Sequence, residues 1–290
     1  MKKFQFQNHC NHLRINSTKV IKSVNYNQHA ILKDIMDLHM NGEAFDVDPT
    51  YSVGNFYGKF KRIVQEKQED GKIVEKEDEF EIPQPKYKFD VDPQVEGCEK
   101  LDPWGRWPLE DESVNYINFD PPFVIGPRDC ASMFNGKKDS NVIGKRFSSY
   151  YPVAELLSSY YHHLQEAYRV LKKDGLIVFK CQNTTTGGKE LHSTSWVWLC
   201  ASSLGFEVLD KFTLVSKQRL ISGKVIKQQH ARKYDSCFYV LKKNSKKNIH
   251  YFDFMTEEQL DEFISGLKKN WMTNKNKVSE IKTPTVTIND

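Results

Sequence analysis

Three short segments of this chain end on an aspartate that is followed by proline. Phe45-Asp-Val-Asp48-Pro49 and Phe89-Asp-Val-Asp92-Pro93 are the same five residues, and segment 114–120 ends in Asp120-Pro121-Pro122. Apolar residues alternate with aspartate in the two copies and proline bounds each segment, which predicts strands. The two five-residue copies suggest parallel strands that end alike. In a sheet of parallel strands, the crevice beyond the carboxyl ends is where ligands bind.

Helical and strand patterns alternate along the rest of the chain. Apolar spacing predicts helices over 28–40, 152–171 and 193–204, and strands over 176–181, 207–215 and 237–241. Strands that alternate with helices indicate an α/β fold with a doubly wound, mostly parallel sheet covered on both faces. The last two strands have no helix between them, which predicts an antiparallel edge.

Composition changes mark the expected domain boundaries. Residues 1–24 are polar and read as an N-terminal arm, and 25–248 form the main domain. Within it, a charged hairpin with an Asp70-Gly71 turn is expected at about 61–84, and a basic loop at about 124–150. Thr256 opens a capping box, so 249–290 are expected to be a C-terminal helix followed by a disordered tail.

Charge and hydropathy exclude several classes of protein. The net charge is +4, which is mild support for a polyanionic partner. No apolar run approaches the roughly 18 residues of a membrane span, and the N-terminus lacks the apolar region of a secretory signal, so a cytoplasmic location is expected. The six cysteines form no CxxC pair, and the ligand-like His9-Cys10-Asn11-His12 has no partner pair at metal spacing; we expect no metal.

The strongest signal for chemistry is Asp120-Pro121-Pro122-Phe123 at the end of a strand. Two prolines fix φ and remove donors, so the Asp120 carboxylate, the Pro121 carbonyl and the Phe123 ring are held stiffly. An exocyclic amine of a base is a poor nucleophile because its lone pair is delocalised into the ring. Acceptors on both N–H bonds would localise that lone pair, and an aromatic ring would stack on a base turned out of the helix. The alternative is a rigid turn without chemistry.

These motifs together resemble the amino-methyltransferases of the class I, Rossmann-like S-adenosylmethionine family. The similarity is greatest to the small DNA N6-adenine and N4-cytosine methylases of phages, and it runs from about residue 31 to residue 243. The hairpin is an extra insertion within it. The resemblance implies S-adenosyl-L-methionine as cofactor and DNA as partner.

The resemblance assigns the cofactor site to the strand ends. Asp48-Pro49-Thr50-Tyr-Ser-Val-Gly54 resembles the family's first motif, with Ser52 where a glycine is usual. Gly54 would permit close approach of the backbone. By the same resemblance, Asp90 would accept hydrogen bonds from the ribose, Asp102 would lie near the adenine amino group, and Asp120 would complete the cofactor set.

Target recognition is less legible in the sequence. Basic residues after the catalytic loop and before the last strand are candidates for phosphate contacts: Arg128, Lys145, Arg146, Arg232 and Lys233. A solvated surface explains each of them equally well. Cys181-Gln182 resembles the nucleophile of C5-cytosine enzymes, but it lies in an apolar strand and is interpreted as a core thiol.

Three functions therefore stay open from the sequence. The first is methylation of adenine N6 or cytosine N4 in DNA by direct in-line transfer. The second is methylation of RNA, for example guanine N2 of tRNA. The third is a catalytically inactive relative that binds nucleic acid. The sequence does not decide the oligomeric state.

Overall fold

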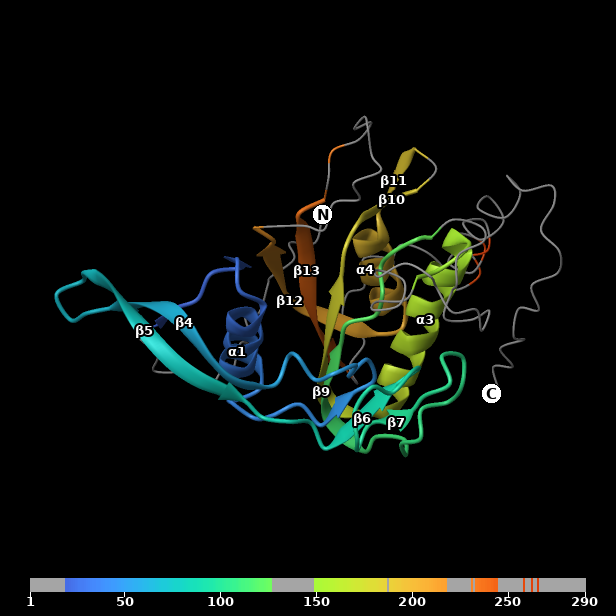
Figure 1. Cartoon of the computed structure of the whole chain (residues 1–290), viewed down its shortest axis with the longest axis horizontal. Helices are drawn as coiled ribbons and strands as arrows, with labels where there is room; N and C mark the ends of the chain where they lie inside the picture. Colours follow the sequence, from blue (N-terminus) through green and yellow to red (C-terminus); the bar gives the residue numbers. More distant parts are fainter. Residues whose placement is uncertain are drawn as a thin grey trace, which may run out of the picture.

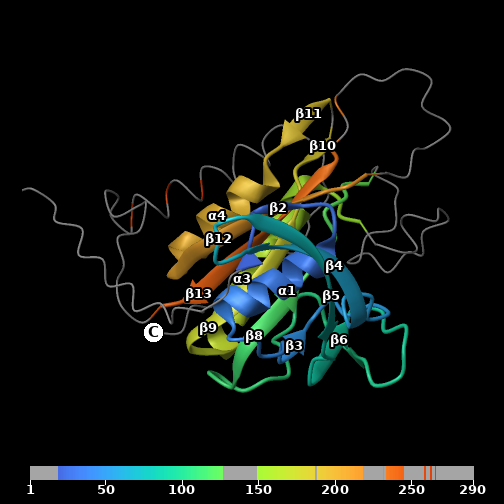
Figure 2. The ribbon, with the colours of Figure 1, turned by 90° about the vertical axis from the view of Figure 1, so that its left-hand side faces the viewer.

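A sheet of eight strands is the centre of the molecule. The computed structural model describes residues 19–126, 149–186, 188–217, 231, 233–244, 258, 262 and 265. The eight strands are β2 (Val24–Asn25), β3 (Val47–Asp48), β6 (Tyr87–Asp90), β7 (Glu99–Lys100), β8 (Val114–Phe119), β9 (Leu171–Cys181), β12 (Phe206–Val215) and β13 (Asp235–Lys243). Their order across the sheet is β2-β12-β13-β9-β8-β3-β6-β7 (Figures 1 and 2).

One strand of this sheet runs against the others. β7, β6, β3, β8 and β9 are mutually parallel, and β13 is antiparallel to both of its neighbours, β9 and β12. The predicted α/β class with a mostly parallel sheet is confirmed. The prediction of an antiparallel edge strand is wrong in one respect, because the antiparallel strand β13 lies inside the sheet, between β12 and β9. The strand at this edge of the sheet is β2, which pairs with the other side of β12.

Helices cover the two faces of the sheet, as the apolar spacing predicts. α1 (Gln28–His39) lies on one face, and α3 (Val153–Val170) and α4 (Ser193–Ser203) lie on the other (Figures 1 and 2). The Asn27 side chain begins α1 by accepting hydrogen bonds from the N–H groups of His29 and Ala30. The bounds of all three helices agree with the sequence prediction to within one residue at each end.

Each face of the sheet has its own hydrophobic core. Ile177 and Phe179 of β9 belong to the core under α3 and α4, whereas Leu176 and Val178 belong to the core under α1. Successive side chains of a strand point to opposite faces. The next residue in this alternation, Lys180, therefore faces the α1 side, at the carboxyl end of β9.

The charged hairpin is formed by the antiparallel strands β4 (Gly58–Lys67) and β5 (Ile73–Ile82). The short strand β1 (Lys19–Val20) pairs in antiparallel direction with the other side of β4. Its turn end reaches away from the sheet (Figure 1). Its base packs on α1, where the buried guanidinium of Arg62 pairs with Asp34, Asp37 and Asp78. A second, small hairpin joins β10 (Thr184–Thr186) to β11 (Lys189–Leu191).

Parts of the sequence prediction fall outside the described residues. These are most of the N-terminal arm, the greater part of the 124–150 loop and all but three positions of 249–290. Among the described helices, none is both long and apolar enough to cross a membrane.

Candidate functional site

The carboxyl ends of four parallel strands bring the candidate residues to one edge of the sheet. Asp48 is the last residue of β3, Asp90 is the last residue of β6, Asp120 follows β8, and Lys180 is the penultimate residue of β9. These strands are neighbours in the order β9-β8-β3-β6. Three of these side chains are expected at this edge from the sequence, and the fourth, Lys180, is not.

Asp48 is fully buried and is held by side chains from three segments. Its Oδ1 accepts hydrogen bonds from the backbone N–H (2.8 Å) and the hydroxyl (3.1 Å) of Thr50. Its Oδ2 accepts from the Tyr57 hydroxyl at 2.6 Å and from Asn118 Nδ2 at 3.3 Å. Burial raises the pKa of Asp48 to about 7, against the effect of the hydrogen bonds from Tyr57 and Thr50. Near neutral pH this carboxyl is therefore partly protonated.

Thr50 connects the two motifs that the sequence analysis treats separately. Its hydroxyl donates to Asp48 and accepts the backbone N–H of Asp120 at 2.9 Å. The turn after β3 and the turn after β8 are thus joined by one side chain. Thr50 was assigned to the cofactor; its contacts in the structure are with these two aspartates.

The Asp120 carboxylate lies at the surface of the site and not in the core. Its side chain is 20% exposed, and its Oδ2 is 2.8 Å from the ammonium of Lys180, whose side chain is 11% exposed. Among the described residues, no other side chain or backbone donor reaches this carboxylate. One oxygen of Asp120 is therefore neutralised by a cation, and the other is available to a ligand.

The loop after β8 continues from Asp120 through two prolines. Pro121 is buried, and Pro122 and Phe123 are half-buried. The Pro122 carbonyl accepts a hydrogen bond from the buried Tyr160 hydroxyl of α3 at 2.9 Å. The Pro121 carbonyl has no protein donor among the described residues, so it and Asp120 Oδ1 are two free acceptors on adjacent residues.

The loop after β3 makes a left-handed turn beside β6. Ser52 and Gly54 have φ values of +52° and +73°, and the Ser52 N–H donates to Asp90 Oδ2 at 2.8 Å. A Cβ on Gly54 would lie 2.4 Å from the Tyr51 hydroxyl oxygen. The requirement for glycine at position 54 thus comes from φ and from the Tyr51 ring.

Asp90 and Asp102 have different surroundings. Asp90 Oδ1 accepts the Asp92 N–H at 2.9 Å, and burial raises the pKa of Asp90. Asp102 is exposed, two residues beyond the short edge strand β7, and its Oδ1 accepts the Trp104 N–H at 2.9 Å. The structure brings Asp90 to the turn that carries Gly54, whereas Asp102 makes no described contact with the other candidates.

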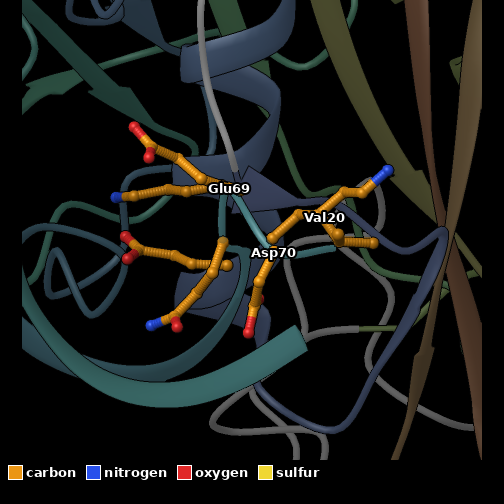
Figure 3. Close-up of a pocket in the computed structure, with 7 residues that line it drawn as sticks. Val20, Glu69 and Asp70 are labelled. Atoms are coloured by element: carbon orange, nitrogen blue, oxygen red, sulfur yellow. The ribbon is translucent and has the colours of Figure 1, made fainter. Parts of the chain in front are cut away.

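Of the five basic residues expected to contact phosphates, only Lys233 lies within the described part of the chain. Its ammonium is 2.7 Å from Glu190 of β11. Arg128, Lys145, Arg146 and Arg232 lie outside the described residues, as do His9, Cys10 and His12. An open hollow between β1 and the turn of the β4–β5 hairpin, lined in part by Val20, Glu69 and Asp70, lies on the hairpin and away from the strand ends (Figure 3).

Cys181 is a core thiol, as interpreted from the sequence. It is fully buried on β9, with its Sγ 3.5 Å from Cys237 Sγ on β13. Burial raises the pKa of the Cys181 thiol. A buried thiol whose pKa is raised is not an activated nucleophile.

Three residues of the site were not selected from the sequence: Tyr57, Asn118 and Lys180. Asn118 and Lys180 are polar side chains within the otherwise apolar stretches 116–119 and 176–181, and this departure from the pattern is the signal that marks them. Asn118 Oδ1 is a buried acceptor with no partner among the described residues. Tyr57 gives no comparable signal, because a tyrosine near a strand end is commonplace in a core.

The residues at this edge suit S-adenosyl-L-methionine. Two hydroxyls of a ribose need an acceptor, and Asp90 offers its carboxylate at the end of β6. The backbone of the Ser52–Gly54 turn, tied to the same carboxylate, lies between β6 and the Asp120 loop. Asp48 would hold this turn through Thr50 rather than contact a cofactor itself, because it is fully buried.

The mostly parallel sheet with helices on both faces is the Rossmann-like fold of class I methyltransferases. Comparison with protein families is consistent with this. Residues 114–285, more than half of the chain, match the family described as DNA methylase, and the chain belongs to this family. No curated protein matches the chain.

Solved structures with a related arrangement are distant. TTHA0409 of Thermus thermophilus, assigned as a DNA modification methylase, is 14% identical over 53% of each chain, with a TM-score of 0.30. PvuII DNA methyltransferase, which is cytosine-N4-specific, is 16% identical over 47% of this chain and 45% of its own, with a TM-score of 0.33. The chain thus spans about half the length of these proteins, and at these scores the likeness carries no argument about activity.

Proposed function

We propose that this protein transfers a methyl group from S-adenosyl-L-methionine to the exocyclic amino nitrogen of a base in DNA, adenine N6 or cytosine N4. The observation that carries the proposal is the Asp120 carboxylate, held at the end of β8 with one oxygen free. It stands beside the Pro121 carbonyl and is joined through Thr50 to the turn after β3. Membership of the DNA methylase family supports DNA as the substrate.

The chain's own groups account for the activation of the amine. The bound cofactor would supply an electrophilic methyl group on a sulfonium. Asp120 Oδ1 and the Pro121 carbonyl would accept the two N–H bonds of the base and so localise the nitrogen lone pair. Because these acceptors are fixed before the base arrives, they need no reorganisation during transfer. Phe123 would stack on a base turned out of the duplex.

Proton removal needs no further group in this scheme. Transfer leaves a positively charged, acidic nitrogen that still donates to Asp120, and the proton leaves through that hydrogen bond to solvent. Basic side chains would contact phosphates. The candidates are Arg128, Lys145 and Arg146 of the loop at about 124–150, and Arg232 and Lys233 before the last strand. A cytoplasmic location fits an enzyme that acts on DNA.

A transfer assay tests the proposal directly. The protein is incubated with tritiated S-adenosyl-L-methionine and with DNA, tRNA or rRNA, and the labelled nucleosides are identified by chromatography and mass spectrometry. We expect N6-methyladenine or N4-methylcytosine in DNA. Label confined to RNA would overturn the choice of substrate.

Asp120→Ala separates catalysis from binding in the same assay. The variant is expected to lose transfer while its affinity for S-adenosyl-L-methionine, measured by calorimetry, stays within about threefold of wild type. If the wild-type chain binds no cofactor, the protein is instead an inactive relative. An active Asp120→Ala variant would exclude the proposed role of the Asp-Pro-Pro-Phe loop.

A further inference from the structure

We propose that Lys180 is a positioning residue that holds one oxygen of Asp120, so that only the other oxygen receives the amino group of the target base. This inference rests on the proposed function and deepens it. The Lys180 ammonium is 2.8 Å from Asp120 Oδ2, and no other described donor contacts that carboxylate. No motif in the sequence identifies Lys180 as part of the site.

The sheet itself brings these two residues together. In the parallel pairing of β8 with β9, Asn118 lies opposite Val178 and Phe119 opposite Phe179. The next pair in this register is Asp120 and Lys180. Both side chains follow the alternation to the α1 face, because their neighbours Phe119 and Phe179 belong to the opposite core.

The surroundings of Lys180 fix its ammonium in place. Its Nζ lies 5.2 Å from the centre of the Phe56 ring and 5.5 Å from that of Phe238, which are cation–π distances. Among the described residues, the only other hydrogen-bond acceptor that contacts it is Gln28 Oε1 at 3.5 Å, on the first residue of α1. A buried lysine between two aromatic rings has few alternatives to its single carboxylate partner.

The ion pair with Lys180 distinguishes the two oxygens of the Asp120 carboxylate, which would be equivalent in an isolated aspartate. An ammonium donates only, so it must contact an acceptor, and it occupies Oδ2. Oδ1 then remains as the acceptor for an N–H of the base. If residue 120 were asparagine, Lys180 would attract the amide oxygen and turn the NH₂ group toward the amine of the base, so that two donors would meet.

If Lys180 orients residue 120, two substitutions that each lower kcat should partly compensate for each other. Asp120→Asn alone is expected to lower kcat about 100-fold or more, because the amide presents a donor to the base. In the double variant Asp120→Asn with Lys180→Met, nothing holds the amide oxygen, so it can turn toward the base. We expect the double variant to be at least about tenfold more active than Asp120→Asn.

Lys180→Met alone and Lys180→Gln give the complementary result. Methionine leaves Asp120 without its partner, and kcat is expected to fall about tenfold with little change in KM. A glutamine at position 180 can donate to the Asp120 carboxylate, and it can equally accept from an amide at position 120. Lys180→Gln should therefore keep more activity than Lys180→Met. Combined with Asp120→Asn it should again exceed Asp120→Asn alone, which provides a second test if the methionine variant does not fold.

Lys243→Met is the matched control. Lys243 is also a buried lysine over an aromatic ring, that of Tyr168 at 4.9 Å, and it pairs with Glu112 at 3.1 Å. It lies at the opposite end of the sheet from the site. Its side chain is as buried as that of Lys180, although its carboxylate partner Glu112 is 65% exposed. Its replacement removes a buried ammonium without touching Asp120, so kcat should stay within about twofold of wild type when measured well below the unfolding temperature.

Cofactor affinity gives a readout that does not depend on transfer. Calorimetry should find the Kd for S-adenosyl-L-methionine of every Lys180 variant within about threefold of wild type. A double variant no more active than Asp120→Asn, or a Lys180→Met variant that loses cofactor affinity and activity together, would overturn this inference alone. A wild-type chain that methylates no nucleic acid would overturn the proposed function and this inference with it.

Discussion

The hydroxyl of Thr50 accepts the backbone N–H of Asp120 at 2.9 Å and donates to the carboxylate of Asp48. Two loops that are 70 residues apart in the chain are therefore coupled by one side chain. The proposed cofactor turn begins directly after Thr50, and Asp120 is itself the proposed acceptor for the base. A displacement of either loop would therefore shift the other loop through this contact.

Thr50→Val removes both hydrogen bonds while it preserves the shape of the side chain. We expect transfer to slow by about 10- to 100-fold, because Asp120 loses the contact that fixes its backbone. The free energy of unfolding should fall by about 1–2 kcal/mol. Thr50→Ser keeps the hydroxyl and should retain most of the activity. Equal activity in the valine and serine variants, measured by tritium transfer, would refute the coupling.

Because Asp48 is buried, we expect the free energy of unfolding to depend on pH through the protonation of its carboxyl. Its pKa is raised by burial from an ordinary value of 3.8 to about 7 in the folded protein. Between these values the unfolded chain releases the proton and the folded protein retains it, so this carboxyl makes the free energy of unfolding fall as pH rises from about 4 to about 7. The contribution is at most about 1.4 kcal/mol per pH unit.

Asp48→Asn isolates that contribution. Asparagine does not ionise, so the stability of the variant relative to wild type should improve steadily as pH rises from about 4 to 7 and then level off. Urea unfolding at pH 5, 6, 7 and 8 measures this difference, and other carboxyls cancel because both proteins contain them. A difference that is flat across this range would show that Asp48 is ionised throughout.

Much of this fold is predictable from periodicity. The three helices and the strands that precede the functional loops have the expected places, because apolar spacing alone determines which face of each element is buried. The position of β13 inside the sheet is not predictable in this way. Strand order depends on which edges meet in space, and both an edge position and an internal position suit the apolar sequence of β13.

The candidate site was predictable only where residues follow a recognisable order along the chain. Asp90 and Asp120 end strands and are followed by turn residues, so their place at the sheet edge follows from the sequence. Lys180 is different, because its role depends on the register between β8 and β9. The contacts of Thr50 were likewise out of reach, since a threonine after a proline gives no indication of what its hydroxyl will bond.

Gly54→Ala should damage the cofactor site more than glycine replacement at another left-handed position. An alanine at φ of +73° is strained, and its Cβ would lie 2.4 Å from the Tyr51 hydroxyl oxygen. The Tyr51 ring or the turn must then move. We expect affinity for S-adenosyl-L-methionine, measured by calorimetry, to fall at least about tenfold.

Gly71→Ala is the control for this experiment. Gly71 has a similar φ of +82° in the exposed hairpin turn, but an added Cβ there meets nothing within 4 Å. The cost should be limited to backbone strain of about 1 kcal/mol, with cofactor affinity unchanged. If both alanine variants bind the cofactor as wild type does, the turn at Gly54 is not part of the cofactor site.

We expect the ion pairs of Arg62, which attach the charged hairpin to α1, to contribute to the free energy of unfolding of the domain. Its side chain is 2% exposed and pairs with Asp34 and Asp37 of α1 and with Asp78 of β5. Arg62→Met leaves the buried Asp34 carboxylate without its cation, which should lower the free energy of unfolding by about 3–5 kcal/mol at pH 8. Asp37 and Asp78 are less buried and keep their ion pairs with Lys33 and Lys19. Burial already raises the pKa of Asp34 to about 6. At lower pH this carboxyl therefore binds a proton, and the loss of its cation destabilises the protein less. The loss should therefore be smaller at pH 5 than at pH 8.

Lys61→Met is the matched control, because Lys61 is the preceding residue of β4 and its ion pairs with Glu77 and Glu79 are exposed. Its replacement should leave the unfolding transition unchanged at both pH values. Urea denaturation of the three proteins at pH 5 and pH 8 gives the comparison. If Arg62→Met were as stable as Lys61→Met, the hairpin would be an independent projection, and its contact with α1 would contribute nothing to the stability of the domain.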